Sequence, residues 1–516
     1  MRVLQSFVAL TALLVTIAPV NVAAQCRTFT VRKELNDMTA QDWAVYKSTI
    51  LRAHATPDPN DPRYSIWEYG AYLHNQVANV IHGNCQFLFW HRMFTRWMEQ
   101  RLQAIDSRFQ FFYWDSARQW RNPTASTIFT HFGTSGRPVR DGFLANAFFK
   151  TTNSYLTRNF RFPDMGGILP SLETYTQLQI DSGRQGGFSF YASRMELFHG
   201  QMHVLLGGPG ESGQIQSMHS PNDPFFYSHH SHIDWLWFNA QASWINQGRG
   251  PEYQIGGLDD RNMTCTLNNR LAGFQSVFAD VLDLRRMCVR YLMPGQSAGA
   301  QPGGVVPGGV MPGGVVPGGV IPGGVVPGGV IPGGLPPGSG LPEQRRSLVS
   351  VPSGGTVSLN SAAISPNSIG GGSPYGEQLV PYQLPSGYHK MDQCPQALPP
   401  WWLARNFRNP DASSLCESIR ARCEELRAQI ASGQQTAPFT IINDSIDRIP
   451  MTSIIDINAP RAAPMNVPLQ PHIDPGYFAH DGPIYSAAQT VLLSPNTRKI
   501  GWAFAPLVAG ILALVL

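Results

Sequence analysis

The stretch AYLHNQVANVIHGNCQFLFWHR, residues 71–92, decides the fold of this 516-residue chain because it holds three closely spaced histidines in a segment of helical apolar spacing. Two further stretches, ELFHGQMHVLLGG (196–208) and SPNDPFFYSHHSHIDWLW (220–237), also concentrate histidines. Together they supply six candidate metal ligands: His74, His82, His91, His199, His203 and His230. Neutral imidazoles suit copper, and three nitrogens per ion leave positions open for dioxygen. The sequence therefore predicts two copper ions per chain.

The spacing of these histidines predicts which elements carry them. His199 and His203 lie one helical turn apart, so both rings project from one helix face toward one ion. His230 and Asp234 share that spacing, and Asp234 is expected either to accept the N–H of a ligand ring or to pair with Arg92. Ligands on several facing helices predict a mainly α fold whose helix-bundle core holds a binuclear copper site. Few carboxylates lie near the histidines, which argues against magnesium or calcium.

Two of these stretches resemble the signatures of a known copper family. HGNCQFLFWHR (82–92) is similar to the copper-A signature of tyrosinases, catechol oxidases and molluscan haemocyanins, and SPNDPFFYSHHSHIDWLW is similar to their copper-B signature. FFYWDSARQW (111–120) and VRKELNDMT (31–39) resemble other segments of the same family. The resemblance spans residues 26–295. It implies a type 3 binuclear copper centre that binds dioxygen between the metals.

Other histidines compete for the ligand positions. His54 is the alternative to His74 and lies in a Pro- and Asp-rich stretch, RAHATPDPNDPR, which we expect to be a loop. We favour His74, because a ligand on a helix is placed more rigidly than one on a loop. In the His229–His230 pair the family pattern makes the second residue the ligand. His229 then either lines the site or packs beside it.

The chain departs from the family pattern at two positions. Many members carry a Cys two residues before the second copper-A histidine, thioether-linked to it, and here that residue is Val80. Strong monophenol hydroxylases often have Asn directly after the first copper-B histidine, where it helps a Glu to activate a water; here it is Gly200. Glu196, one helical turn before His199, is the candidate for that catalytic role, and an exposed helix carboxylate is the simpler interpretation. The second departure, Gly200, favours oxidation of ortho-diphenols over hydroxylation of monophenols.

Both ends of the chain predict export. Residues 1–24 contain one Arg, then an apolar run, and end in small residues that suit a cleavage site. This order is typical of a secretory signal peptide. Residues 500–516 are an apolar run, shorter than the ~20 residues of a spanning helix, behind a spacer and the small residues that follow Tyr485. That order predicts a GPI-attachment propeptide at 487–516, with a weak tail anchor as the alternative. We expect an extracellular or cell-surface protein, held to the membrane by a lipid.

Composition agrees with this compartment and narrows the partners. Seven cysteines fit an oxidising environment, and Cys85 is expected to form a disulfide. The sequons at Asn262 and Asn443 predict N-glycosylation. A formal net charge of +4, with no basic stripe and no RNA-binding motif, predicts no binding to nucleic acid.

A repetitive segment divides the chain. Between residues 302 and 336 the unit Pro-Gly-Gly-Val-Xaa repeats and resembles elastin-type pentapeptides. Pro followed by Gly favours type II turns, and both residues disfavour helix and sheet. We predict an elastin-like disordered linker over 296–373, acting as a spacer, a self-associating tether or an inert connection. A small α+β C-terminal domain at 374–486 follows, with a helix near 412–432.

These observations predict a copper oxidase. Its substrates are ortho-diphenols, which dioxygen converts to ortho-quinones, and monophenols are further candidate substrates. The quinones would serve pigment (melanin) formation or protein crosslinking, so the expected partners are small phenols, dioxygen and cell-wall or matrix proteins. A haemocyanin-like oxygen-binding protein is the alternative, because it would use the same ligands.

Overall fold

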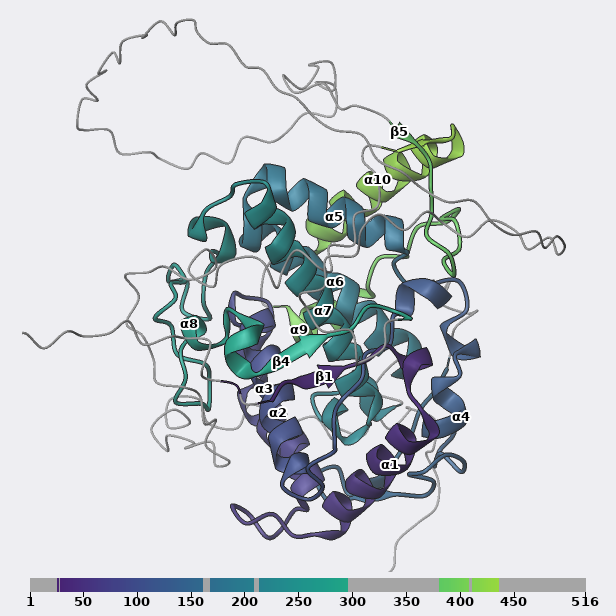
Figure 1. Cartoon of the computed structure of the whole chain (residues 1–516), viewed down its shortest axis with the longest axis vertical. Helices are drawn as coiled ribbons and strands as arrows, with labels where there is room; N and C mark the ends of the chain where they lie inside the picture. Colours follow the sequence, from purple (N-terminus) through teal and green to yellow (C-terminus); the bar gives the residue numbers. More distant parts are fainter. Residues whose placement is uncertain are drawn as a thin grey trace, which may run out of the picture. The chain divides into compact units, whose positions relative to one another are not determined.

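The computed structural model describes residues 26, 28–160, 168–207, 213–295, 380–407 and 411–435 (Figure 1). The predicted signal peptide, linker and GPI-attachment segment lie outside these residues, as does Asn443. Helices dominate the regular structure, which confirms the prediction of a mainly α fold. Within the described residues, no helix is both long enough and apolar enough to cross a bilayer.

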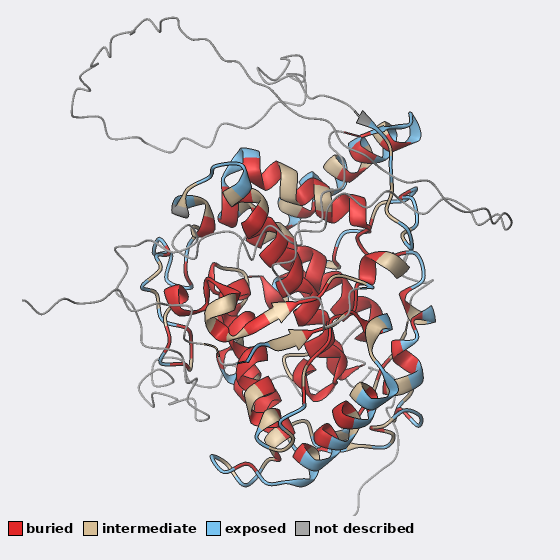
Figure 2. Ribbon diagram, in the orientation of Figure 1, coloured by how far each residue is buried: buried red, intermediate tan, exposed pale blue. Residues whose placement is uncertain are grey.

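The long helices form a bundle in which α3 packs against α2 and α7, while α5 packs against α6. Their bounds are α1 Ala40–Ala55, α2 Ile66–Ile81, α3 Gln86–Gln103, α5 Leu172–Gln185, α6 Gly187–Gly207 and α7 Phe225–Asn246. Buried residues surround α3, α6 and α7 on nearly every side (Figure 2). A helix that is buried all round belongs to the centre of a domain, so these three helices form the core.

The start of α2 is defined by its first turn. The Ser65 hydroxyl accepts the Glu68 backbone N–H, and the Glu68 carboxylate accepts the Ser65 N–H in return. This capping box satisfies backbone N–H groups that a helix start leaves unpaired. From there α2 runs to Ile81, so His74 lies in its interior. Beyond His74 the helix continues through the apolar residues Val77 and Ile81, which are buried.

Short strands join the two ends of the copper domain. β1 (Thr30–Arg32) pairs in parallel with β4 (Val289–Tyr291), and the disulfide Cys26–Cys288 lies directly beside this pair. Arg32 is fully buried and forms an ion pair with Glu99 of α3. The other short elements are α4 Ile128–Phe132, α8 Phe278–Val281, β2 Phe148–Phe149 and β3 Ser154–Tyr155, of which β2 and β3 pair antiparallel.

Residues 380–407 and 411–435 pack on the outside of α5 and α6. Their elements are β5 Val380–Pro381, α9 Pro400–Asn406, α10 Ala412–Ala431 and β6 Gln434–Gln435, of which β5 and β6 pair antiparallel. The helix expected at 412–432 is therefore present as α10. The disulfide Cys394–Cys423 ties α10 to the segment before α9. Tyr388 donates a hydrogen bond to the buried carboxylate of Asp115, and Tyr382 donates one to Glu173, so polar contacts also hold this segment to the bundle.

Candidate metal centre

The structure brings the six histidines together in two groups of three. His74 lies in α2, His82 is the residue that ends it, and His91 lies in α3. The second group has two members on α6 and one on α7: His199, His203 and His230. Within each group the ring nitrogens available as ligands all lie within 4.8 Å of one another.

Backbone carbonyls select the tautomer of these rings. The Nδ1 atoms of His74, His82 and His91 lie 2.7, 3.0 and 2.8 Å from the carbonyl oxygens of Met218, Ala78 and Phe87. Nδ1 of His203 is likewise within hydrogen-bonding distance of the backbone carbonyl oxygen of Ile215. A ring that donates its proton from Nδ1 keeps a lone pair on Nε2, so Nε2 is the atom offered as a ligand.

The Nε2 atoms of each group face one another. In the first group, Nε2 of His91 lies 3.3 Å from Nε2 of His74. In the second, Nε2 of His199 lies 3.1 Å from that of His230 and 2.7 Å from that of His203. Buried lone pairs that converge in this way need a cation between them, because a buried polar atom without a partner is costly. The two groups therefore fit a dicopper centre.

Burial keeps the six imidazoles neutral. It lowers the pKa of His82 and of His203 to about 4, mainly through loss of solvation. The same cause, reinforced by neighbouring histidines, lowers the pKa of His74, His91, His199 and His230 well below the usual value. Neutral imidazole is the form that binds a metal, so no proton has to be removed first at neutral pH.

Arg92 and Asp234 join the helices that carry His91 and His230. Asp234 accepts a 2.5 Å bond from Nε of Arg92 and a 2.8 Å bond from the Tyr291 hydroxyl. Of the two roles expected for Asp234, pairing with Arg92 is the one observed, and Nδ1 of His230 has no partner among the described residues. The ion pair sets the distance between α3 and α7, whose ligand rings stack with centroids 4.3 Å apart.

His54 and His229 lie outside both groups. His54 belongs to the last turn of α1, so the expectation of a loop is wrong: the prolines that suggested it come after the helix ends. Its ring lies against Phe149. His229 packs behind His199, with ring centroids 5.2 Å apart, and its Nε2 lies 3.3 Å from the His199 carbonyl oxygen. His229 thus supports the helix and ring of a candidate ligand without offering a nitrogen to either group.

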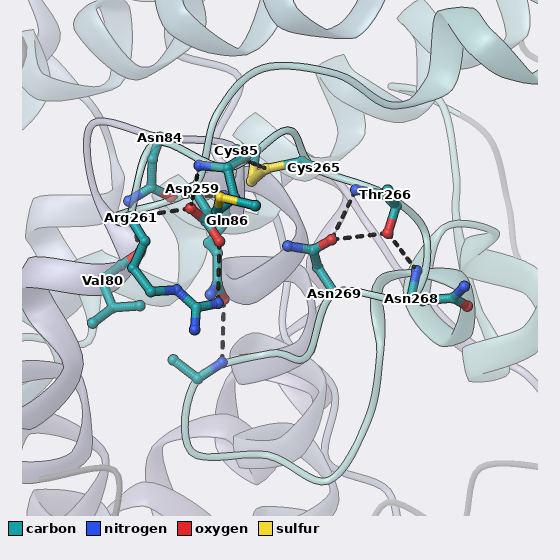
Figure 3. Close-up of a disulfide and its surroundings, with 12 residues drawn as sticks. Val80, Asn84, Cys85, Gln86, Asp259, Arg261, Cys265, Thr266, Asn268 and Asn269 are labelled. Atoms are coloured by element: carbon teal, nitrogen blue, oxygen red, sulfur yellow. Dashed lines mark hydrogen bonds and ion pairs between the residues drawn. A yellow bond between two sulfur atoms is a disulfide. The ribbon is translucent and has the colours of Figure 1, made fainter.

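The loop after His82 is fixed by cross-links from other parts of the chain. Cys85 forms the expected disulfide, with Cys265, and joins the start of α3 to the loop at 256–269 (Figure 3). Gly83 adopts a positive φ of 70°, and its N–H donates a 2.8 Å hydrogen bond to Oε1 of Glu196. Glu196 is only 2% exposed, so its interpretation as an exposed helix carboxylate is wrong. Burial raises the pKa of this carboxyl well above its usual value.

Gly200 has a specific packing role. The ring of Trp402, from α9, lies directly on it, and a Cβ added at Gly200 would overlap ring carbons of Trp402. Val204, one turn further along α6, joins Trp402 and Leu403 in one buried apolar cluster. The side of α6 next to His199 is therefore covered by α9, and glycine is the residue that lets the indole approach.

A cavity of about 790 Å³ lies beside His82, and part of its lining comes from the same C-terminal segment that carries Trp402. His82, the one half-buried ligand candidate, lines it together with Glu196 of α6, the 256–262 loop and the first half of α10. Asn262 lies exposed at this cavity with a φ of 59°, so its sequon is on an accessible turn and glycosylation there stays a prediction.

Comparison with known proteins agrees with this geometry. The family model for the common central domain of tyrosinase matches residues 64–184 and 145–244, which hold all six histidines. The helical copper domain belongs to the tyrosinase family. The tyrosinase ustQ of Aspergillus flavus is 28% identical over 267 residues, covering 47% of this chain and 71% of that protein.

Haemocyanins are also among the similar proteins. Hemocyanin 2 of Megathura crenulata is 29% identical over 230 residues, which cover 41% of this chain but only 6% of that much longer protein. A polyphenol oxidase variant of Thermothelomyces thermophila is a solved structure with 17% identity and a TM-score of 0.42, covering 53% of this chain and 92% of that one. By sequence, the domain is similar both to a tyrosinase and to a haemocyanin.

Sequence reasoning missed two contributors to the site. Trp402 carried no signal, because nothing in the local pattern connects α9 with Gly200. The Gly83–Glu196 hydrogen bond joins residues 113 positions apart and was equally hidden.

The three disulfides use six of the seven cysteines and leave Cys416 buried and free. Disulfides of this number indicate a protein of an oxidising, extracellular environment.

Proposed function

We propose that this tyrosinase-family domain oxidises ortho-diphenols to ortho-quinones with dioxygen. The observation that carries the proposal is the convergence of Nε2 atoms in two adjacent histidine groups, each able to hold one copper. The copper pair, when bound, supplies the exchange of electrons between phenol and dioxygen. The ligands in this proposal are His74, His82, His91, His199, His203 and His230.

The protein residues hold this centre in place and control access to it. The Arg92–Asp234 pair keeps α3 and α7 in register, so the two histidine groups stay adjacent. Aromatic rings exclude water around them: Phe87 lies 4.9 Å from both His91 and His199, and Phe226 lies 4.1 Å from His230, measured between centroids. A fixed, dry and neutral set of ligands favours a metal centre whose chemistry is not diverted by solvent.

The C-terminal segment is proposed to restrict access from the copper-B side. Trp402 and Leu403 lie on the face of α6 that carries Gly200 and Val204, and Trp402 is itself 4% exposed. A substrate approaching there has to displace α9 first. Activity would then be lower in the intact chain than in a chain whose C-terminal segment has been released.

Export and attachment to the outer membrane surface by a lipid remain proposals. Treatment of intact cells with a phosphatidylinositol-specific phospholipase releases a GPI-anchored protein. Retention on the cells, or detection of residues 500–516 in the mature chain by mass spectrometry, would contradict the anchor.

The proposed activity is tested by copper content and oxygen uptake together. We expect two coppers per chain and oxygen consumption on addition of 4-methylcatechol, faster than with tyrosine. The alternative, an oxygen carrier, has a specific observation behind it, namely the similarity to haemocyanins. Reversible oxygen binding by the copper-loaded protein without quinone formation, also after removal of the C-terminal segment, would favour the carrier. One zinc per chain would exclude both functions.

A further inference from the structure

One stretch of backbone holds a ring in each of the two histidine groups. It covers residues 213–222, between α6 and α7, and we call it the bridging segment. The carbonyl oxygen of Ile215 accepts from Nδ1 of His203, and that of Met218 lies 2.7 Å from Nδ1 of His74. Three other ligand rings bond to carbonyls three or four residues earlier in the chain: His82, His91 and His199. Among the described residues, the bridging segment is thus the only stretch whose backbone bonds a ring in both groups.

The bond at Nδ1 decides where Nε2 points. A helix places the Cα atom of a histidine, but the ring can still turn about the side-chain torsions. A hydrogen bond to Nδ1 stops that rotation and directs Nε2 toward one point. His74 and His203 receive this bond from outside their own helices. A displacement of the bridging segment would therefore turn one ligand in each group.

The bridging segment is stiffened by its own hydrogen bonds. The Ser217 N–H donates to the carbonyl oxygen of Gln214, and the Ser220 N–H donates to that of Ser217, both at 2.9 Å. The Ser217 hydroxyl donates a further 2.9 Å bond to the Gln214 carbonyl. Because each turn starts where the previous one ends, a shift at Gln214 is passed on to Ile215 and Met218.

Gln214 fastens the start of this segment to the β2–β3 hairpin. Its side chain is buried, and Nε2 donates to the hydroxyls of Thr152 and Ser154, at 3.0 and 3.2 Å. Nε2 also lies 3.3 Å from the Tyr155 carbonyl oxygen, and the Gln214 N–H donates to the Thr157 carbonyl. A carbonyl can only accept, so the nitrogen of the amide, and not its oxygen, faces the hairpin.

The other end of the bridging segment has separate anchors. The Asn222 carbonyl accepts a 2.9 Å bond from the indole N–H of Trp67 in α2, and the Asn222 side chain bonds to Thr151. Loss of the Gln214 contacts should therefore shift the segment near Ile215 and Met218 without detaching it.

We propose that Gln214 is a positioning residue of the dicopper centre and acts through the bridging segment on His203 and His74. The inference rests on the proposed copper ligands and adds a residue that lies outside the ligand set. Its consequence is a joint effect. A change at Gln214 should alter both metals together, whereas loss of a ligand alters mainly the metal that it binds.

The test is Gln214→Met in the full chain. Methionine has a similar length and fills the buried space, but it cannot donate a hydrogen bond. Competition with a Cu(I) chelator measures the dissociation constants of both coppers. Both should rise by about tenfold, the lower end of the ~10–100-fold typical of losing a group that bonds directly to a ligand. Unchanged constants, or an effect on one copper alone, overturn the inference. If the wild-type chain binds no copper, the proposed function itself fails.

A spectrum separates positioning from general destabilisation. Co(II) loaded in place of copper has a visible absorption that depends on the directions of its ligands, so the spectrum of Gln214→Met should differ from that of the wild type. Gln103→Met is the matched control, because Gln103 likewise donates to a threonine hydroxyl and a backbone carbonyl, at the C-terminal end of α3. It should lower the thermal stability and leave the spectrum and both copper constants unchanged. Equal changes in the two variants would overturn the specific role of Gln214.

A change in the hairpin covers the case in which Gln214→Met does not fold. Thr152→Val combined with Ser154→Ala removes two of the three acceptors of Gln214 Nε2, at half-buried positions. We expect a smaller joint rise of both copper dissociation constants and a change in the Co(II) spectrum. Wild-type constants and a wild-type spectrum in this double variant overturn the inference without any substitution at Gln214.

Discussion

The copper-A and copper-B halves of the centre are held by different means. The copper-B candidates lie within the long helices α6 and α7, which are buried on nearly every side. On the copper-A side His82 ends α2 and leads into a loop with Gly83 at a positive φ. Helix packing fixes the copper-B candidates and also His74 and His91, whereas the position of His82 depends on the Cys85–Cys265 disulfide and on the hydrogen bond that the Gly83 N–H donates to Glu196.

The two halves also differ in what covers them. The face of α6 that carries Gly200 is covered by Trp402 of α9, whereas His82 lines the cavity of about 790 Å³. A rigid, covered half and a cross-linked, accessible half would divide the work between them.

The largest expected effect comes from removing a ligand of the rigid half. His203→Ala should lower the copper content from two ions to about one per chain and reduce oxidation of 4-methylcatechol by more than the ~10–100-fold typical of losing a group that only hydrogen-bonds to a ligand. Metal analysis and oxygen uptake measure both. His131→Ala is the control, because its ring stacks on Trp43 away from the centre. Two tightly bound coppers in His203→Ala would contradict the ligand assignment.

The next effect separates the two halves. Replacing Cys85 and Cys265 by Ala should cost about 2–5 kcal/mol of unfolding free energy and release copper mainly from the copper-A side, since the loop after His82 loses its covalent support. Removing the Cys394–Cys423 disulfide should instead loosen α10 and leave two coppers bound. Thermal unfolding and copper titration distinguish these outcomes. Equal loss of both coppers in the first variant would show that the halves are not independent.

The ligand positions on one helix could be predicted from the sequence, because they depend only on the spacing of nearby residues. His199 and His203 are one turn apart, and that spacing alone places both rings on one face. The sequence does not decide between the two roles of Asp234, because the answer depends on how α3 and α7 approach each other. The prolines beyond His54 predict a loop there, although His54 itself belongs to the last turn of α1. Pairings across long stretches of chain, such as Cys85–Cys265, leave no trace in local pattern.

Gly200 illustrates the same limit from the opposite direction. Its sequence interpretation rested on a missing Asn and on what that Asn does in relatives. The structure adds that a side chain at this position would overlap Trp402, so glycine is also required by packing. A substitution there tests two effects at once unless α9 is moved first.

The cover over the copper-B half can be weakened through Trp402. Trp402→Ala should destabilise the docking of α9 by about 3 kcal/mol or more, as for other buried aromatic residues. If α9 limits access, such a loss can raise the open population, and with it kcat/KM for bulky catechols, by up to ~10²-fold. Trp401→Ala is the control, because Trp401 is the adjacent residue and its own indole is 36% exposed. Unchanged kcat/KM together with faster proteolysis of residues 380–435 would show that α9 is released without controlling access.

The smallest effect is expected at Gly200. It has to be measured both in the wild-type chain and in the Trp402→Ala variant. In the wild-type chain, Gly200→Asn should mainly dislodge Trp402, so its kinetic effect should resemble that of Trp402→Ala and should not be specific to monophenols. In Trp402→Ala the space above α6 is free, and there Gly200→Asn should raise the tyrosine rate relative to the catechol rate, because the amide can then act beside Glu196. Initial rates on both substrates for the two single variants and the double variant give the coupling between the sites. Additive effects would mean that residue 200 and the indole act independently, and that the steric explanation for glycine at this position is wrong.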